Sequence, residues 1–359
     1  MKFILFISIL SILLCCKSVE QSQNNIESSK LNKTNFDSWH HSDLTFDSIP
    51  GISLEKWYKE NKSLKPKNEI IVAVLDTQID LNHEDLQGQL WKNEKEIPNN
   101  NIDDDNNGYI DDVNGWNFLG TKSGNYIVWS NFDYVRIVRK WKTHFENKKK
   151  EDIIEAEKVV FDDFKKAKSM LEYKQKYYSA YIKAFDYLKN IYPKSSDTLK
   201  HYFPNGNYGL NQLDSLYKKY KINDKSFPER QIDKDEDFGA LIDYMYICHL
   251  YNCNTLDKLN DKTIQYDSIL NKNLNIEYNE RLFIGDNENV LEKDYGHNKI
   301  YSKISGIRSF NNHSTKVSSI IAANRNNNIG IKGFTNNIKI MPLVVSCSGD
   351  EYDKDIGLT

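Results

Sequence analysis

The sequence has almost no net charge, and this absence argues against two classes of partner. Lysine and arginine number 48 against 51 aspartate and glutamate residues in 359 positions, which gives a formal net charge of −3. A chain without an excess of positive charge favours neither a nucleic acid nor an acidic membrane surface as its partner. Apolar residues still make up 39% of the chain, which is enough to bury a core. The length is long for one domain and short for three.

Cysteine is also scarce, with five residues in the chain. Two of them end an N-terminal apolar run, so three remain elsewhere: Cys248, Cys253 and Cys347. An odd number argues against a disulfide scaffold. Cys248 and Cys253 lie in a stretch with a helical pattern, in which their spacing would turn them to different faces. We expect free, buried thiols, although a loop at Asn252 would allow these two to pair.

The sequence lacks an apolar run of about 20 residues, the length that a membrane-spanning helix needs. A positive start and the apolar run 3–14 fit a secretion signal instead. The run ends in Leu14, Cys15 and Cys16 and resembles a bacterial lipobox, in which the first mature residue is a lipidated cysteine. Cys16 suits that role because the residue before the cut is normally small. We predict a signal peptide over 1–16 and an exported lipoprotein anchored to the membrane at the cell envelope or surface. The alternative is an ordinary signal with two incidental cysteines.

The first half of the chain predicts a tether followed by an α/β domain. Residues 17–50 are rich in Ser, Asn and Gln without an apolar period, which predicts a flexible tether. The first part of the folded domain is expected over 51–124. Within it, 70–75 is a continuous β-branched run, typical of a strand buried on both faces of a parallel sheet. Asp76 follows at the carboxyl end of this strand, where α/β folds place their chemistry.

The segment 125–300 has a different pattern. Apolar residues recur every three or four positions over 153–188, which predicts a long amphipathic helix ended by Pro193. A second helix is predicted over 240–251, and no catalytic motif occurs in the segment. The remaining residues, 301–359, return to an α/β pattern with a second buried strand near their end. The sequence therefore predicts an α/β fold, a partial parallel sheet with flanking helices that a long, mainly helical insertion interrupts.

Three short segments carry the residues that bear chemistry. They are residues 71–86, 313–323 and 336–345, which read IVAVLDTQIDLNHEDL, HSTKVSSIIAA and NNIKIMPLVV. In order and internal spacing they resemble the subtilisin-like serine peptidases. That family has a strand ending in Asp-Thr/Ser-Gly, then His-x-Asp-Leu, a helix that opens with His-Gly-Thr-His-Val-Ala-Gly, and a later strand similar to "akimplkv". The resemblance covers residues 51–118 and 306–356 and implies a subtilisin-like sheet.

The resemblance implies that Asp76 is the aspartate and His313 the histidine of an Asp/His/Ser triad. Acyl transfer from a serine needs a base that takes the hydroxyl proton, and histidine is the side chain that titrates near neutrality. The aspartate fixes the tautomer of the imidazole and stabilises the imidazolium. The family is one of secreted endopeptidases, so protein or peptide substrates are implied.

Several positions depart from the family pattern. Gln78 replaces the glycine after Asp-Thr, and Ser314, Lys316 and Ser319 replace two glycines and a histidine of the helix motif. The nucleophile segment Gly-Thr-Ser-Met-Ala is missing, since no Gly-Thr-Ser occurs in the sequence. We therefore expect the chain to match the N-terminal part of the family and to be inactive alone. The alternative is a non-catalytic cell-surface lipoprotein, derived from a peptidase, that binds through its helical segment.

An Asp/Asn-rich loop predicts a structural calcium site. Its residues follow the D-x-[DN]-x-[DN]-G pattern of calcium loops, in which hard oxygen ligands alternate. The twelfth position is Asn114 instead of the usual glutamate, so the affinity should be weak or the site completed elsewhere. Separately, the family resemblance implies a calcium ligand in its His-x-Asp-Leu motif. The predicted Ca²⁺ ligands are Asp85, Asp103, Asp105, Asn107, Tyr109 and Asp111. The alternative is a solvated loop without metal.

Overall fold

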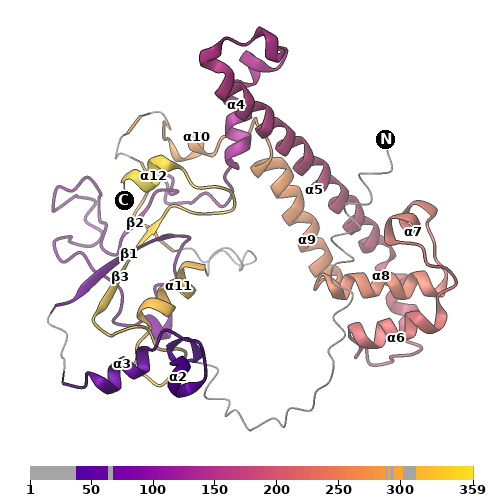
Figure 1. Cartoon of the computed structure of the whole chain (residues 1–359), viewed down its shortest axis with the longest axis horizontal. Helices are drawn as coiled ribbons and strands as arrows, with labels where there is room; N and C mark the ends of the chain where they lie inside the picture. The colour runs from indigo at the N-terminus through magenta and orange to yellow at the C-terminus, as the bar shows by residue number, and fades with distance from the viewer. Residues whose placement is uncertain (1–37, 64–67, 288–289, 292–294, 302–312, 359) are drawn as a thin grey trace. The chain divides into compact units, whose positions relative to one another are not determined.

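The computed structural model of the chain describes residues 38–63, 68–287, 290–291, 295–301 and 313–358 (Figure 1). The signal peptide predicted over 1–16, with Cys16, lies outside the described residues. The chain divides into two compact units, Met1–Lys65 and Pro66–Thr359. Within the described residues, no helix combines the length and the apolar character that crossing a membrane requires.

The first unit contains short helices, and it corrects the predicted tether. The helices are η2 (Trp39–His41), α2 (Leu44–Asp47) and α3 (Leu54–Glu60). The carboxylate of Asp43 caps α2 by accepting hydrogen bonds from the backbone N–H groups of Thr45 and Phe46 at 2.9 and 3.0 Å. His41 is fully buried. The tether predicted over 17–50 therefore ends too late, because short helices begun by polar caps lack the apolar period that marks longer ones.

The second unit contains a parallel sheet of three strands, β1 (Ile70–Asp76), β2 (Trp116–Asn117) and β3 (Ile338–Val344). The spatial order is β1-β3-β2, and both pairings are parallel. In the β1–β3 register, Ile70 lies opposite Ile338 and Asp76 lies opposite Val344. The two predicted strands, far apart in the sequence, are thus immediate neighbours in one sheet.

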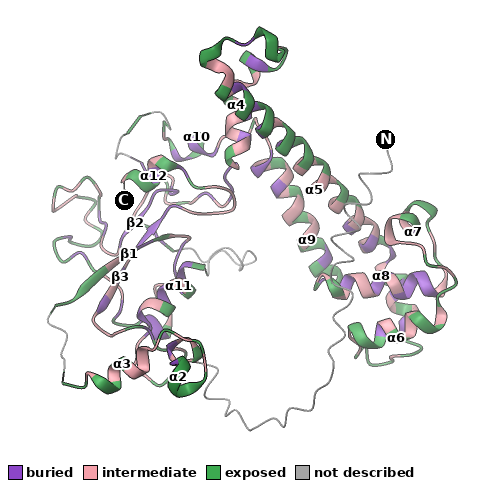
Figure 2. Cartoon of the chain, in the orientation of Figure 1, coloured by how far each residue is buried: buried purple, intermediate pink, exposed green. Residues whose placement is uncertain are grey.

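β1 is an edge strand of this sheet, so the prediction that it is buried on both faces is wrong. Ile70, Ile71 and Leu75 are 54%, 52% and 39% exposed, whereas Val74 is buried. The central strand β3 is buried at most of its positions (Figure 2). A β-branched run favours a strand with two neighbours. Within the described residues, β1 has one neighbouring strand, β3. The number of neighbours depends on the whole sheet and not on the sequence of the strand itself.

Two hydrophobic cores lie on opposite faces of the sheet, because successive side chains of β3 alternate between the faces. Ile338 and Ile340 join the core that includes the helix α11 (His313–Ala322) and the short helix η3 (Glu84–Leu86). Leu343 joins the other core, with Trp116 of β2. The helix α12 (Asp353–Leu358) follows β3. Both faces of the central strand β3 are therefore covered, as an α/β fold requires, whereas β1 stays largely exposed at the edge.

Helices occupy most of the chain between β2 and α11. They are α4 (Asp133–Phe145), η4 (Lys150–Asp152), η5 (Glu155–Glu157), α5 (Lys158–Leu199), α6 (Leu210–Tyr220), α7 (Phe227–Asp233), α8 (Phe238–Leu250), α9 (Leu256–Ser268), the π-helix η6 (Ile269–Asn273) and α10 (Glu280–Ile284). The long helix α5 joins two cores. Its first half packs with α4 and η6, and its second half packs with α6 and α8.

The helix α5 does not end at Pro193, as the sequence predicted, but continues to Leu199. Pro193 itself is exposed, so its ring meets solvent and not another helix. Ile191, Ser195 and Leu199 are buried along the opposite side of the same helix. Burial of these side chains offsets the cost of an internal proline, which is why tertiary packing overrides the local signal.

Candidate active site

The end of β1 and the start of α11 bring Asp76 and His313 into direct contact. The Nδ1 atom of His313 lies 2.7 Å from Oδ2 and 2.9 Å from Oδ1 of Asp76, across 237 positions of sequence. The aspartate side chain is 12% exposed and the histidine side chain 67% exposed. The pair therefore has a sheltered carboxylate and an imidazole that is open to solvent.

Backbone groups fix the position of Asp76 from two sides. Its carbonyl oxygen accepts hydrogen bonds from the N–H groups of Val345 at 3.0 Å and Ser346 at 3.2 Å, just beyond the end of β3. Its carboxylate accepts a further hydrogen bond from the N–H of Thr77 at 2.5 Å. Hydrogen bonds to a carboxylate stabilise its charged form and hold it in one orientation.

Two threonine hydroxyls join the loop after β1 to the first turn of α11. The N–H of Ser314 donates to Oγ1 of Thr77 at 3.2 Å, and the N–H of Asp80 donates to Oγ1 of Thr315 at 3.0 Å. The first bond satisfies an N–H group that the start of a helix leaves without an intrahelical partner. Sequence reasoning quoted both threonines inside the motifs but assigned them no role. Their reciprocal bonds place the imidazole at the end of β1.

The geometry determines which nitrogen of His313 is available. A carboxylate is an acceptor, so Nδ1 facing Asp76 carries the proton of the neutral imidazole. Nε2 is then the unprotonated nitrogen, on the far side of the ring. An imidazole held in this tautomer can take a proton from a hydroxyl or water that faces Nε2.

The positions that depart from the family pattern fall into two groups. Ser314, Ser319 and Gln78 are buried, with exposed fractions of 0%, 7% and 3%. Serine is small enough for a helix that packs closely on the sheet. Gln78 is larger than the glycine of the pattern, and its buried Oε1 has no hydrogen-bond partner among the described residues. Lys316 is exposed. Its charge is therefore hydrated, and Lys316 does not bring the free-energy cost of a buried charge to the site.

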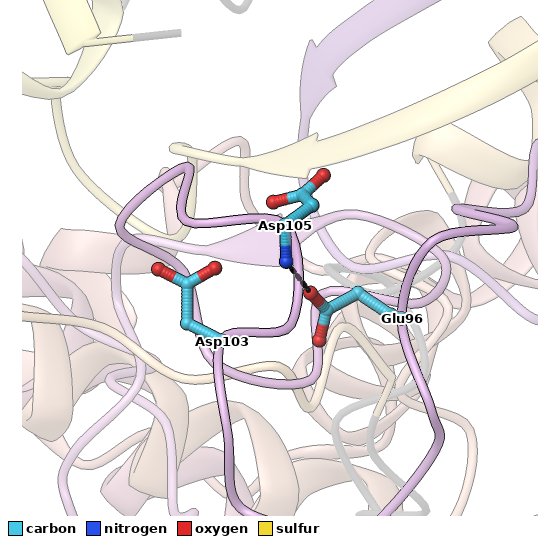
Figure 3. Close-up of side chains that lie close together, drawn as sticks. All are labelled: Glu96, Asp103 and Asp105. Atoms are coloured by element: carbon cyan, nitrogen blue, oxygen red, sulfur yellow. Dashed lines mark hydrogen bonds between the residues drawn. The ribbon is translucent and has the colours of Figure 1, made fainter.

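Part of the predicted calcium loop gathers acidic side chains. One carboxylate oxygen from each of Glu96, Asp103 and Asp105 lies within 4.8 Å of the others (Figure 3). Asp103 and Asp105 were predicted from the loop pattern, but Glu96 precedes the loop and was missed. Its Oε1 accepts a hydrogen bond from the N–H of Asp105 at 3.3 Å, which draws it to the loop. Three hard oxygen donors at this separation fit the ligand preference of Ca²⁺.

The other predicted loop ligands have different contacts. The carboxylate of Asp111 is buried and accepts hydrogen bonds from the backbone N–H groups of Asn100 at 3.2 Å and Asn101 at 3.0 Å. The Oδ1 atom of Asn107 accepts a hydrogen bond from the N–H of Tyr109 at 2.8 Å. These side-chain oxygens organise the loop backbone, and among the described residues Asp111 is not part of the acidic group formed by Glu96, Asp103 and Asp105.

Asp85 lies apart from the acidic group and anchors another loop. Its Oδ1 accepts a hydrogen bond from Nδ2 of Asn327 at 2.9 Å, and its Oδ2 accepts one from the N–H of Ile331 at 3.0 Å. Gly330 has a φ of 54°, and a Cβ there would meet Oδ2 of Asp85 at 2.2 Å. The loop thus folds tightly around a carboxylate that is 2% exposed.

Comparison with known proteins agrees with this geometry. The model of the family described as Subtilase family matches residues 67–357, which include both Asp76 and His313. A curated protein, "Subtilisin-like protease 1" of Plasmodium berghei (strain Anka), is 47% identical over 49 residues, which cover 13% of this chain and 8% of that protein. No solved structure matches the chain. Since the family match extends over most of its length, the chain belongs to the subtilase family.

Proposed function

We propose that Asp76 and His313 are the aspartate and histidine of the triad of a serine endopeptidase. The supporting observation is their hydrogen bond of 2.7 Å between segments that lie 237 positions apart. Membership of the subtilase family implies a serine endopeptidase with protein or peptide substrates. In this proposal His313 takes the proton of the attacking serine hydroxyl through Nε2. Asp76 holds the tautomer and stabilises the imidazolium that forms.

No serine of the sequence lies in the nucleophile motif of the family. The sequence contains no Gly-Thr-Ser, the motif that carries the nucleophilic serine in the subtilase family. A His–Asp pair without a nucleophile cannot form an acyl-enzyme. We therefore expect the 359-residue chain, taken alone, to show no peptidase turnover.

The second candidate is a non-catalytic lipoprotein that binds a partner at the cell surface. Gln78 and Lys316 support it, because both replace residues of the family's catalytic motifs. In this candidate the helical segment from α4 to α10 is the binding part. The contact between Asp76 and His313 favours the peptidase, since a degraded site has no chemical reason to keep an aligned His–carboxylate pair.

Three further features belong to the proposal. The helical segment, predicted over 125–300, is an insertion between two parts of one catalytic domain, because β1 and β3 pair directly across it. The protein is exported and carries its lipid on Cys16. A structural Ca²⁺ is held by Glu96, Asp103 and Asp105, the acidic group of the loop.

A fluorophosphonate probe tests the peptidase. It reacts with the serine of an assembled triad, so the gene is expressed together with the sequence that follows codon 359, and the product is captured by an antibody to residues 38–63. The proposal expects labelling that His313→Ala and Asp76→Ala abolish and Asp80→Ala keeps, since Asp80 is an exposed carboxylate of the same loop. Absence of labelling would favour the binding lipoprotein. Labelling of the 359-residue chain through one of its own serines would contradict the missing nucleophile.

A further inference from the structure

Two cysteines meet at the C-terminal end of α8. The helix ends at Leu250, and Asn252 adopts the left-handed conformation with a φ of 56°. The N–H of Cys253 then donates to the carbonyl oxygen of Cys248 at 2.7 Å. A left-handed residue four positions after the bonded carbonyl, with the donating N–H one residue further on, is the Schellman termination of a helix. The prediction that both are free, buried thiols agrees with the structure. The helical spacing behind the prediction of different faces does not apply, because the helix stops before Cys253.

The Schellman motif joins the backbones of these two residues through the hydrogen bond between them. The residue at the position of Cys253 commonly makes a hydrophobic contact with the one at the position of Cys248. Cys248 and Cys253 are 1% and 2% exposed and belong to one hydrophobic core. Burial, and next the neighbouring Cys253, raise the pKa of the Cys248 thiol to about 12. In the structure both side chains are thiols.

The backbone hydrogen bond also limits how far apart the two Cα atoms can lie. The path from one Cα through the bonded oxygen and nitrogen to the other is at most about 6.6 Å, from standard bond lengths with the carbonyl angle of about 120° and the hydrogen bond of 2.7 Å. A disulfide spans Cα atoms up to about 6.8 Å apart. The Cα separation that this bond allows therefore meets the distance limit for a disulfide.

We propose that Cys248 and Cys253 form a disulfide that closes the C-terminal turn of α8. This inference goes beyond the proposed function and adds a covalent link inside the helical segment. The export proposed above supports it, since disulfides persist in oxidising compartments outside the cytosol. Cys347 lies in another part of the fold, beyond β3, and stays a free thiol in this proposal.

The oxidation step takes place while the helical segment folds, because burial excludes reagents from both thiols afterwards. One thiolate attacks a sulfur of an oxidised dithiol, such as a thiol oxidase or oxidised glutathione, and forms a mixed disulfide. The second thiolate attacks the cysteine sulfur of that bond and releases the partner as a thiol. The two cysteines lose two electrons and two protons, and the partner disulfide is reduced to two thiols.

Peptide mass spectrometry of the full chain tests the link without any variant. The chain is refolded in a buffer of reduced and oxidised glutathione, then unfolded with iodoacetamide and digested with trypsin. Residues 235–258 form one tryptic peptide that contains both cysteines, since no lysine or arginine interrupts it. The proposal expects this peptide about 2 Da lighter and unalkylated, with two alkyl groups after reduction. The peptide with Cys347 is alkylated in both samples. Two alkyl groups on peptide 235–258 before reduction, or a link to another cysteine, would overturn the proposal.

Thermal stability gives a second measurement. Chain refolded without oxidant should melt about 4–8 °C lower than chain refolded in the redox buffer, because the link restricts the unfolded state. The difference should vanish in the double variant Cys248→Ala, Cys253→Ala and persist in Cys347→Ala. An equal difference in the double variant would contradict the link. Refolding in vitro does not depend on export, so failure here is distinct from failure of the peptidase, which the fluorophosphonate probe reports.

Discussion

At the scale of single residues, a small number of hydrogen bonds orients the carboxylate of Asp76. Asp76 receives hydrogen bonds on its carbonyl from the chain after β3 and on its carboxylate from Thr77 and His313. These bonds come from the segment after β3, the residue after Asp76 and the start of α11, so no single segment forms the pair alone. His313 is held at one edge of its ring and open at the other, which is the arrangement a general base needs.

Asp76→Ala should remove the low-field proton resonance of His313. In the wild-type chain, the Nδ1 proton lies in a hydrogen bond of 2.7 Å to the carboxylate, which shifts its resonance downfield and protects it from exchange. The alanine variant should lose the signal, as seen by one-dimensional NMR of the imidazole region. Asp80→Ala, which removes an exposed carboxylate nearby, should keep it. A low-field signal that survives in Asp76→Ala would show that another group orients His313.

At the scale of elements, two segments show how packing changes the meaning of a local signal. α5 runs through Pro193, because its buried residues on either side hold the helix together. The Asp/Asn-rich loop acquires Glu96 from outside the repeat of Asp and Asn residues, because backbone N–H groups of the loop donate hydrogen bonds to that carboxylate. In both cases a contact from another turn or loop decides the outcome.

Pro193→Ala should stabilise the protein. Proline in a helix interior costs about 3 kcal/mol relative to alanine, and Pro193 is exposed, so its replacement removes little packing. We expect the free energy of unfolding to rise by about 1–3 kcal/mol in urea denaturation of the helical segment. Pro204→Ala, in the turn after α5, is the control and should change it by less than about 1 kcal/mol. Destabilisation by Pro193→Ala would mean that the proline ring makes packing contacts that outweigh its helix cost.

Glu96→Gln should weaken Ca²⁺ binding. The variant replaces one of three neighbouring carboxylates with a neutral amide, so calorimetric titration should show an affinity lower by about tenfold or more. Chelation of Ca²⁺ should lower the melting temperature of the wild type and have less effect on the variant. Glu94→Gln changes an exposed glutamate two positions away and should bind as the wild type does. Equal affinity in both variants would remove Glu96 from the site.

At the scale of the whole molecule, buried polar groups join the helical segment to the sheet. Asn273 of η6 donates from Nδ2 to the carbonyl oxygens of Ser130 at 2.5 Å and Ser348 at 2.6 Å. Arg281 of α10 pairs with Asp355 of α12 at 2.5 Å, and both side chains are buried. Loss of one partner from a buried ion pair leaves an uncompensated charge. The helical segment is therefore fixed to the chain that follows β3, next to the groups that hold Asp76.

Cys16→Ala should abolish lipid attachment. The apolar run that ends at Cys15 and Cys16 motivates the expectation, and metabolic labelling with a fatty-acid probe measures it. The wild-type protein should carry the label and sediment with membranes, whereas the variant should lose both properties. Cys15→Ala is the matched control, since alanine also suits the position before the cut. Equal labelling of Cys16→Ala would refute the assignment.

The sequence by itself determined the local elements and the identity of the paired residues. The runs 70–75 and 338–345 predicted strands that the structure contains as β1 and β3, and the motifs around Asp76 and His313 singled out two side chains that meet. These signals are local, because side-chain periodicity and motif spacing depend only on neighbours along the chain. The subtilase resemblance came from the same short segments.

Tertiary structure alone decided which contacts those elements make. The edge position of β1, the continuation of α5 past Pro193, the arrival of Glu96 at the acidic loop and the approach of Cys253 to Cys248 all depend on where distant or folded-back segments lie. Burial and pairing are properties of the packed chain. A sequence pattern therefore predicts a tertiary contact only where a known motif links the pattern to that contact. Asp76 and His313 had such a motif, whereas Glu96 and Cys253 did not.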